Sequence, residues 1–272
     1  AKEADAVLLI DSPAFNLPLA KAIKEAGAKA AVTYYILPQV WAWKPKRVST
    51  VEKYCDNLAS ILPFDSKFYS RSTYVGHPLM DEIRLKKASL SSSGKVAFLP
   101  GSRRSEISRL MPVYRELAKK IEAKRILVVP SFLLDKVGEI YGDTSDFEVV
   151  SNTPEALYES DFAFVCSGTA TLEAALIGTP FVLAYKAKAI DVFIARKFVK
   201  IKHAGLANIM FDFMGKEPLH EEFIQEFATA ENLLRAYESC DRQKFLKGCD
   251  ELREYLSHGS SKNVVKILKN ME

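Results

Sequence analysis

The stretch Val96-Ala97-Phe98-Leu99-Pro100-Gly101-Ser102-Arg103-Arg104-Ser105-Glu106-Ile107 decides the fold of this chain. Its first four residues form a continuous apolar run, which is typical of a strand buried on both faces. A turn of small and polar residues follows at once, and a helical pattern of apolar residues begins at Ile107. This order of strand, turn and helix is the repeating unit of a parallel sheet covered by helices.

A second stretch of the same kind lies further along the chain. The apolar run from Phe162 to Cys166 is followed by Ser167-Gly168-Thr169-Ala170-Thr171-Leu172-Glu173, which opens another helical pattern. Because the carboxyl ends of parallel strands meet at one edge of a sheet, we expect the two turns to lie side by side. The backbone N–H groups and the positive helix ends of such turns suit phosphate. The two turns together predict a split site for a nucleoside diphosphate.

The side chains of these turns have two possible roles. Arg103 opposes the dipole of the helix that follows it, so a bidentate contact to phosphate is the better explanation for its presence. Gly101, Ser102 and the turn at 167–170 would hold the diphosphate, and Glu173 would accept hydrogen bonds from the ribose. Alternatively, the serines and the threonine are ordinary helix caps, and Glu173 pairs with a surface lysine.

Strands and helices are expected to alternate along most of the chain. We expect strands at 6–10, 30–35, 58–62, 73–75, 96–99, 125–129, 147–150, 162–166 and 181–185. We expect helices at about 18–27, 47–54, 107–122, 132–140, 154–159, 170–177 and 190–200. Beyond Pro218 the chain is expected to be helical, with residues 245, 249, 252 and 256 on one apolar face.

This alternation predicts an α/β fold with two Rossmann-like parallel-sheet domains that face a cleft. Residues 1–83 would form an incomplete amino-terminal domain, and the serine-rich stretch 84–94 would be a linker. Residues 95–250 would form the nucleotide-binding domain. The terminal helices at 251–272 would pack back on the first domain or on a partner. The chain begins almost directly on a strand and without methionine, so we expect the start of the first domain to be missing.

Composition narrows the possible classes of protein. Of 272 residues, 48% are apolar and 26% are charged, which is typical of a soluble globular protein, and no apolar run reaches the ~18 residues of a membrane span. The net charge of +4 is too small to indicate a nucleic-acid partner. The four cysteines form no CxxC pair and have no histidine at ligand spacing, so we expect neither a metal site nor disulfides.

Further candidates for function lie after other predicted strands. Asp11 ends the first strand and is either a general base or a helix cap. Gln39 is a candidate for contact with a sugar. Asn208 follows a glycine turn at Gly205 and is either a turn residue or a contact to the diphosphate. His77 precedes a proline, which is more typical of a structural turn than of catalysis.

Several stretches resemble the lipid-A-disaccharide synthases, a family of glycosyltransferases with the GT-B fold. They run in order over nearly the whole chain: Ile10 to Asn16, Pro38 to Trp43, Ile61 to Phe64, Tyr74 to Leu79, Leu99 to Glu106, Ser167 to Glu173 and Gly205 to Ile209. The Pro38 to Trp43 and Val75 to Leu79 pieces are specific to this family. The piece at 167–170 alone would mark only nucleotide-sugar transferases in general.

The resemblance implies an inverting glycosyltransferase. It would move 2,3-diacylglucosamine from its UDP ester to the 6-hydroxyl of 2,3-diacylglucosamine 1-phosphate, giving the lipid A disaccharide 1-phosphate and UDP. Asp11 would then be the base, and the reaction would need no metal or other cofactor. Two alternatives remain: another UDP-sugar enzyme of the same fold, such as a 2-epimerase or the peptidoglycan precursor transferase, or a nucleotide-binding module without catalysis.

The resemblance also implies a peripheral enzyme on the cytoplasmic side of the inner membrane, and a possible homodimer. A basic cluster surrounds the amphipathic pattern at 190–201 and consists of Lys186, Lys188, Arg196, Lys197, Lys200 and Lys202. Such a cluster would attract anionic lipid. An ordinary surface helix with a solvated face explains it equally well.

Overall fold

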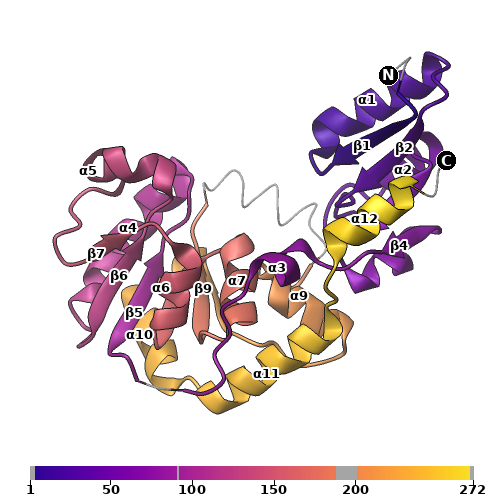
Figure 1. Ribbon diagram of the computed structural model, residues 1–272. Helices are drawn as coiled ribbons and strands as arrows, with labels where there is room; N and C mark the ends of the chain where they lie inside the picture. Colours follow the sequence, from indigo (N-terminus) through magenta and orange to yellow (C-terminus); the bar gives the residue numbers. More distant parts are fainter. Residues whose placement is uncertain (1–3, 91, 188–200, 270–272) are drawn as a thin grey trace. The chain divides into compact units, whose positions relative to one another are not determined.

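The computed structural model describes residues 4–90, 92–187 and 201–269, which divide into two compact units (Figure 1). The first unit contains the described residues up to Glu82 and those from Glu254 onward. The second contains most of the residues between Ile83 and Arg253. Each unit has its own sheet of parallel strands with helices packed on it, so the predicted α/β class is confirmed.

The first unit has a sheet of four parallel strands. Their order in space follows their order in the chain: β1 (Ala6–Ile10), β2 (Ala31–Tyr35), β3 (Asn57–Ser60) and β4 (Ser72–Tyr74). The helices of this unit are α1 (Pro13–Glu25), α2 (Arg47–Tyr54), α3 (Pro78–Glu82), α12 (Ser260–Lys269) and the 3-10 helix η1 (Pro63–Lys67). One apolar core joins α1 and α2 to the sheet, and a smaller one joins α12 to its other face.

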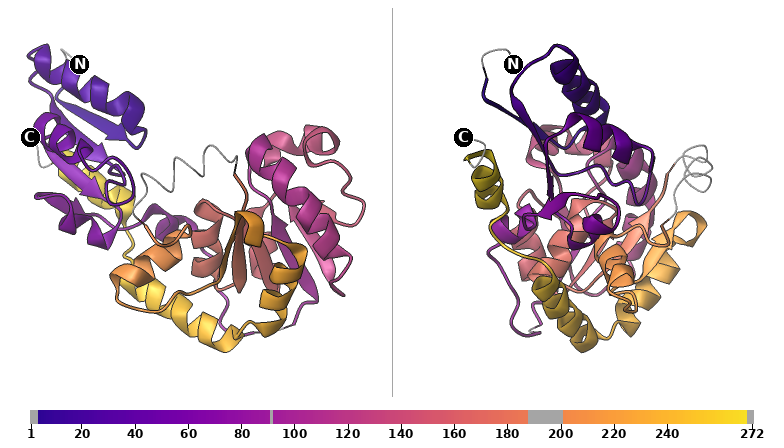
Figure 2. Two further views of the ribbon diagram at one scale, coloured as in Figure 1. Left: turned by 180° about the vertical axis from the view of Figure 1, so that it is seen from behind. Right: turned by 90° about the vertical axis from the view of Figure 1, so that its right-hand side faces the viewer.

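The carboxyl-terminal helix α12 is tied to the first unit by side-chain hydrogen bonds. The Tyr35 hydroxyl lies 2.8 Å from Ser260 Oγ, and the Asp81 carboxylate accepts from the Ser260 N–H at 2.9 Å. Asn263 Nδ2 donates to the Val75 carbonyl at 3.0 Å. Helix α12 accordingly lies beside the strands of the first unit in Figure 1 and in the left view of Figure 2. Helix α12, from the last described part of the chain, thus covers one face of the sheet that the first part forms.

The second unit has a sheet of six parallel strands in the order β10-β9-β8-β5-β6-β7. The strands are β5 (Lys95–Leu99), β6 (Lys124–Val128), β7 (Glu148–Val150), β8 (Phe162–Cys166), β9 (Phe181–Tyr185) and β10 (Glu222–Ile224). The helices are α4 (Arg104–Ala118), α5 (Val137–Tyr141), α6 (Thr153–Glu159), α7 (Thr169–Ile177), α9 (Leu206–Phe213), α10 (Ala230–Ser239), α11 (Arg242–Tyr255) and the 3-10 helices η2 (Ser131–Lys136) and η3 (Gln225–Phe227).

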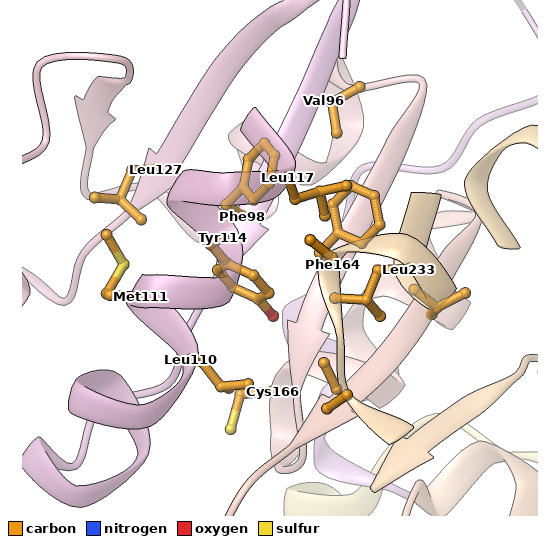
Figure 3. Packing of buried hydrophobic residues seen from close by; sticks show 14 of the residues in the cluster. Val96, Phe98, Leu110, Met111, Tyr114, Leu117, Leu127, Phe164, Cys166 and Leu233 are labelled. Carbon is orange, nitrogen blue, oxygen red and sulfur yellow. The ribbon is translucent and has the colours of Figure 1, made fainter. Parts of the chain in front are cut away.

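One apolar core of the second unit lies between its sheet and the helices α4 and α10 (Figure 3). The buried positions of α4, including Leu110, Tyr114 and Leu117, repeat at helical spacing and form one apolar face. Tyr114 meets Phe98 of β5 edge to face, with ring centroids 5.4 Å apart. Each apolar side chain buried in this way contributes about 1.5–3 kcal/mol. This packing fixes the start of α4 relative to the strands that precede it.

Helix α1 begins earlier than the sequence suggested. The prediction placed its start at about Pro18, but it starts at Pro13, and Pro18 lies inside it. Pro13 suits a first helical turn because proline presets the required φ. Pro18 has no N–H for the Ala14 carbonyl, but both residues are exposed, so water can bind that carbonyl.

Other boundaries differ from the prediction for local reasons. The region beyond Pro218 is not wholly helical, because Glu222–Ile224 pair with β9 as a short parallel strand. Three residues carry too little pattern to separate a strand from a helix. The helix expected at 132–140 begins as the 3-10 helix η2. The predicted apolar face of α11 is confirmed, since residues 245, 249, 252 and 256 are all buried.

The serine-rich segment expected to be a linker is attached to the second unit. The Asp161 carboxylate accepts from the N–H groups of Ser93 and Gly94 at 2.6 and 2.8 Å. The Lys87 N–H donates to the Ile177 carbonyl at 2.8 Å. The helix expected at 190–200 and most of its basic cluster lie outside the described residues. No helix within the described ranges is long and apolar enough to span a membrane.

Candidate nucleotide site

The two turns singled out in the sequence are neighbours in the second unit. Leu99 near the end of β5 pairs with Val165 near the end of β8, so both turns leave the same edge of the sheet. A Cβ atom built on Gly101 would lie 3.3 Å from the Sγ atom of Cys166. The sequence-based expectation that the turns lie side by side is therefore confirmed.

Both helices that follow these turns begin without a side-chain cap. The N-cap residue of α4 is Arg103 and that of α7 is Gly168, and neither makes a capping hydrogen bond through a side chain. Ser102 and Thr169 are exposed beside them, and Ser167 Oγ donates instead to the Ala204 carbonyl at 3.3 Å. The alternative of ordinary serine or threonine caps is therefore wrong. The uncapped helix starts retain the N–H donors that suit an anion.

Arg103 extends from the start of α4 and is held by a carboxylate within the same turn. Its side chain is 77% exposed, and its Nη1 atom lies 2.7 Å from Oε1 of Glu106. The hydrogen bond and the charge of Glu106 raise the pKa of Arg103 further, so the guanidinium is always charged. The neighbouring Arg104 pairs with Glu139 at the same 2.7 Å, but both of those side chains are exposed.

Glu106 is the buried member of this site, although nothing in the sequence pattern marks it as a candidate. The residue is 6% exposed, and a Cβ on Gly101 would lie 2.7 Å from its Oε2 atom. Gly101 has φ of 98°, which disfavours any residue with a side chain. Burial, and secondarily the charge of Glu106, raise the pKa of the Cys166 thiol to about 12. The carboxylate therefore lies against the first turn and near Cys166, the residue before the second turn.

The remaining residues of the second turn lie at the start of α7. Gly168 is exposed and Ala170 is half-buried. Thr171 Oγ1 donates to the Gly168 carbonyl at 2.8 Å, which stabilises the first turn of the helix. Glu173 is the fifth residue of α7 and is half-buried, about 6 Å along the helix from its start. The predicted ribose contact by Glu173 remains a prediction.

Asn208 is a structural residue in this arrangement, which corrects one of its two expected roles. It is fully buried, and its Nδ2 atom donates to the His220 carbonyl at 2.9 Å and to Glu222 Oε1 at 2.8 Å. Its Oδ1 atom accepts from the N–H groups of Leu219 and His220. These partners occupy both donors and the acceptor of the amide. The diphosphate contact is therefore not available to this side chain. Its role is structural, as in the other alternative, but it lies inside α9 and not in the turn at Gly205.

Glu222 organises the same region and was also missed in the sequence. Its side chain is 9% exposed and accepts from the N–H groups of Ala204 and Gly205 at 2.6 and 3.0 Å. A Cβ on Gly205 would lie 2.7 Å from the ring of His220. Burial lowers the pKa of His220 to about 4, so this ring is neutral at pH 7. A protein carboxylate thus already occupies the anion position at the start of α9.

In the first unit, Asp11 is held in an unusual backbone conformation. Asp11 and Ser12 have φ of 47° and 42°, the left-handed region that such residues seldom adopt. Asn16 Nδ2 donates to the carbonyls of Ile10 and Asp11 at 2.9 and 2.7 Å, and the Tyr34 hydroxyl donates to the latter at 2.6 Å. Stored backbone strain of this kind is concentrated at functional sites.

The Asp11 side chain is exposed and has no hydrogen-bond partner within the described residues, so the helix-cap alternative for it is not supported. Its charge adds to the effect of burial in raising the pKa of Tyr34. Gln39 follows β2, the neighbour of β1, and is also exposed at that edge. His77 is buried and accepts from the Leu79 N–H at 3.2 Å, as expected of a turn histidine.

The described ranges contain no group of side chains suited to a metal ion and no disulfide. No three His, Cys, Asp or Glu side chains within residues 4–90, 92–187 and 201–269 are grouped to hold a metal ion. All four cysteines lie in those ranges and are free thiols.

Two units, each with a parallel sheet covered by helices, form the architecture of the GT-B fold, which nucleotide-sugar glycosyltransferases adopt. MurG from Acinetobacter baumannii shares this fold with a TM-score of 0.59 at 13% identity, covering 98% of this chain and 74% of that one. The Staphylococcus aureus MnaA–UDP complex also gives a TM-score of 0.59, at 12% identity, covering 98% of this chain and 75% of that one. At such identities the likeness shows the fold alone.

Sequence comparison identifies the family within this class. Residues 1–266 match the profile of the lipid-A-disaccharide synthetase family, and the chain belongs to that family. The lipid-A-disaccharide synthase of Campylobacter jejuni strain RM1221 is 58% identical over 276 residues, covering 98% of this chain and 76% of the relative. That of Helicobacter pylori strain G27 is 49% identical over 280 residues, covering 97% and 77%. The chain is therefore a glycosyltransferase of lipid A biosynthesis.

Proposed function

We propose that this chain transfers 2,3-diacylglucosamine from its UDP ester to the 6-hydroxyl of 2,3-diacylglucosamine 1-phosphate, with inversion at the anomeric carbon. The products are the lipid A disaccharide 1-phosphate and UDP. Family membership supports this assignment. The observation that carries it is the pair of adjacent, uncapped helix starts beside Arg103, which suits the diphosphate of the donor.

The second unit holds the leaving group in this proposal. Backbone N–H groups around Gly101, Ser102 and the turn at 167–170 bind the diphosphate, and Arg103 adds a charged donor. Glu173 accepts from the ribose hydroxyls. Because negative charge develops on the departing diphosphate, these donors stabilise the transition state more than the bound substrate.

The first unit supplies the base. Asp11 takes the proton of the acceptor hydroxyl as its oxygen attacks the anomeric carbon, and the bond from that carbon to the diphosphate breaks in the same step. The exposure of the Asp11 carboxylate and its constrained backbone support this role. Gln39, exposed at the same edge, is proposed as a contact to a sugar.

Peripheral attachment to the cytoplasmic face of the inner membrane is part of the same proposal. The proposed substrates are lipids, so the enzyme must reach them where they reside in the bilayer. The basic residues clustered around 186–202 in the sequence support electrostatic attraction to anionic lipid.

A titration with UDP tests the donor site directly. Calorimetry with and without magnesium should show binding in both conditions. Arg103→Ala should weaken it by about 1.5–3 kcal/mol, the range for a hydrogen bond to a charged group. Arg104→Ala is the matched control, because it removes a neighbouring arginine that forms an exposed ion pair with Glu139 and has no role in the proposed site. This variant should bind UDP normally. Absence of UDP binding, or equal losses in the two variants, would contradict the site.

An assay of turnover separates the proposed reaction from its alternatives. UDP should be released from UDP-2,3-diacylglucosamine only when the acylated 1-phosphate acceptor is present. Conversion of a non-acylated UDP-sugar without acceptor would support a 2-epimerase instead. Binding of UDP without any turnover would support a nucleotide-binding module.

A further inference from the structure

We infer that Glu106 is a positioning residue of the donor site, which fixes the Arg103 guanidinium in the orientation that binds the diphosphate. This inference rests on the proposed function. Glu106 lies in the first turn of α4, where a carboxylate can also serve only to stabilise the start of the helix through its dipole.

The burial of Glu106 is the first argument. A carboxylate that only complements a helix dipole can remain in water, whereas this one is 6% exposed and has its Oε2 atom directed at Gly101. Removing a carboxylate from water is costly unless a charged partner binds it. Arg103 Nη1, at 2.7 Å from Oε1, is that partner.

The position of Arg103 is the second argument. As N-cap of α4, its guanidinium lies at the positive end of a helix and is 77% exposed. Without Glu106, both the helix dipole and the freedom of a long side chain would favour other orientations. The contact uses Nη1, so the rest of the guanidinium fork remains for a phosphate.

Charge balance is the third argument. The Glu106 carboxylate lies against the first turn, since a Cβ on Gly101 would lie 2.7 Å from its Oε2 atom, and its charge acts on Cys166, the residue before the second turn. Alone, it would repel a diphosphate bound to these turns. Paired with Arg103, it leaves the site without a net negative charge while holding a donor at its mouth.

A thermodynamic cycle in UDP affinity tests the inference. Glu106→Gln preserves the shape and removes the charge, and should weaken UDP binding about fivefold to tenfold because Arg103 must be ordered during binding. In an Arg103→Ala background, the same substitution should cause no loss, or a gain, because only the repulsive charge is removed. Glu139→Gln, which breaks the matched exposed pair with Arg104, should leave UDP affinity unchanged.

The outcomes are distinguishable. If Glu106→Gln binds UDP as tightly as the parent chain, or if its loss adds fully to that of Arg103→Ala, the positioning role is refuted and the donor site stands. If the parent chain does not bind UDP, the donor site itself is refuted, and the inference with it. Should Glu106→Gln not fold, as judged by thermal unfolding, Glu106→Asp keeps the charge but shortens the reach to Arg103. It should lose UDP affinity to a similar degree, and full affinity in this variant would refute the role.

Discussion

Replacement of Gly101 by alanine should destabilise the second unit through two separate effects. Gly101 has φ of 98°, and its Cβ would lie 2.7 Å from Oε2 of the buried Glu106. The backbone effect costs about 1–2 kcal/mol for an L-residue forced into a left-handed conformation. The contact adds about 1–3 kcal/mol, because Glu106 is buried and tied to Arg103 and cannot move freely.

Gly215→Ala is the matched control for this experiment. Gly215 also has a positive φ, 71°, but nothing lies within 4 Å of its Cβ position. It should therefore show the backbone cost of about 1–2 kcal/mol and no more. The difference between the two variants, about 1–3 kcal/mol, isolates the contact with Glu106.

Differential scanning calorimetry measures this difference. For a unit of this size, each kcal/mol shifts Tm by about 2–4 °C. Trp fluorescence would not serve, because Trp41 and Trp43 both belong to the first unit. Gly101→Ala should also weaken UDP binding, since displacement of Glu106 disturbs Arg103, whereas Gly215→Ala should not. Equal Tm shifts in the two variants would refute the crowding at Gly101.

Three further outcomes are expected. Asp11→Asn should lower turnover at least ~100-fold while UDP affinity in calorimetry stays normal, and near-normal turnover would remove this residue as the base. Asn208→Ala should cost about 2–4 kcal/mol in urea unfolding, because it leaves the buried partners of its amide without hydrogen bonds, and a cost below 1 kcal/mol would contradict that structural role. Burial lowers the pKa of His220 to about 4. Between pH 6.5 and 4 its ring therefore stays neutral in the folded chain but is protonated in the unfolded chain. The free energy of unfolding should fall by at most about 3 kcal/mol over this pH range. An NMR titration of its ring with a midpoint near 6.5 would exclude this pH dependence.

The sequence predicts the two turns because each carries its signal locally. An apolar run such as Phe162 to Cys166, followed by small residues and a helical pattern, has few other physical solutions than a buried strand and a turn into a helix. The alternation of such units then places both turns at one edge of a parallel sheet. The candidate residues of these two turns could therefore be named without the structure.

The parts that escaped prediction depend on contacts between distant residues. Glu222 reads as an ordinary charge beside Glu221, yet it binds the N–H groups of Ala204 and Gly205, which lie 17 to 18 residues earlier. The sequence allowed Asn208 to contact the diphosphate, but its side-chain amide forms hydrogen bonds with residues that lie 11 to 14 positions later. Burial of a carboxylate, as in Glu106, also has no signature in sequence, because burial depends on tertiary packing.

The attachment of α12 to the first sheet has a consequence for synthesis of the chain. Tyr35 emerges from the ribosome more than two hundred residues before Ser260, the partner of its hydroxyl. The face of the first sheet that α12 covers therefore stays without this helix until α12 has been translated, while the second unit can already fold. A nascent chain arrested before Ser260 would present that apolar face to chaperones or to other nascent chains. Removal of α12 would leave the same face without its cover permanently.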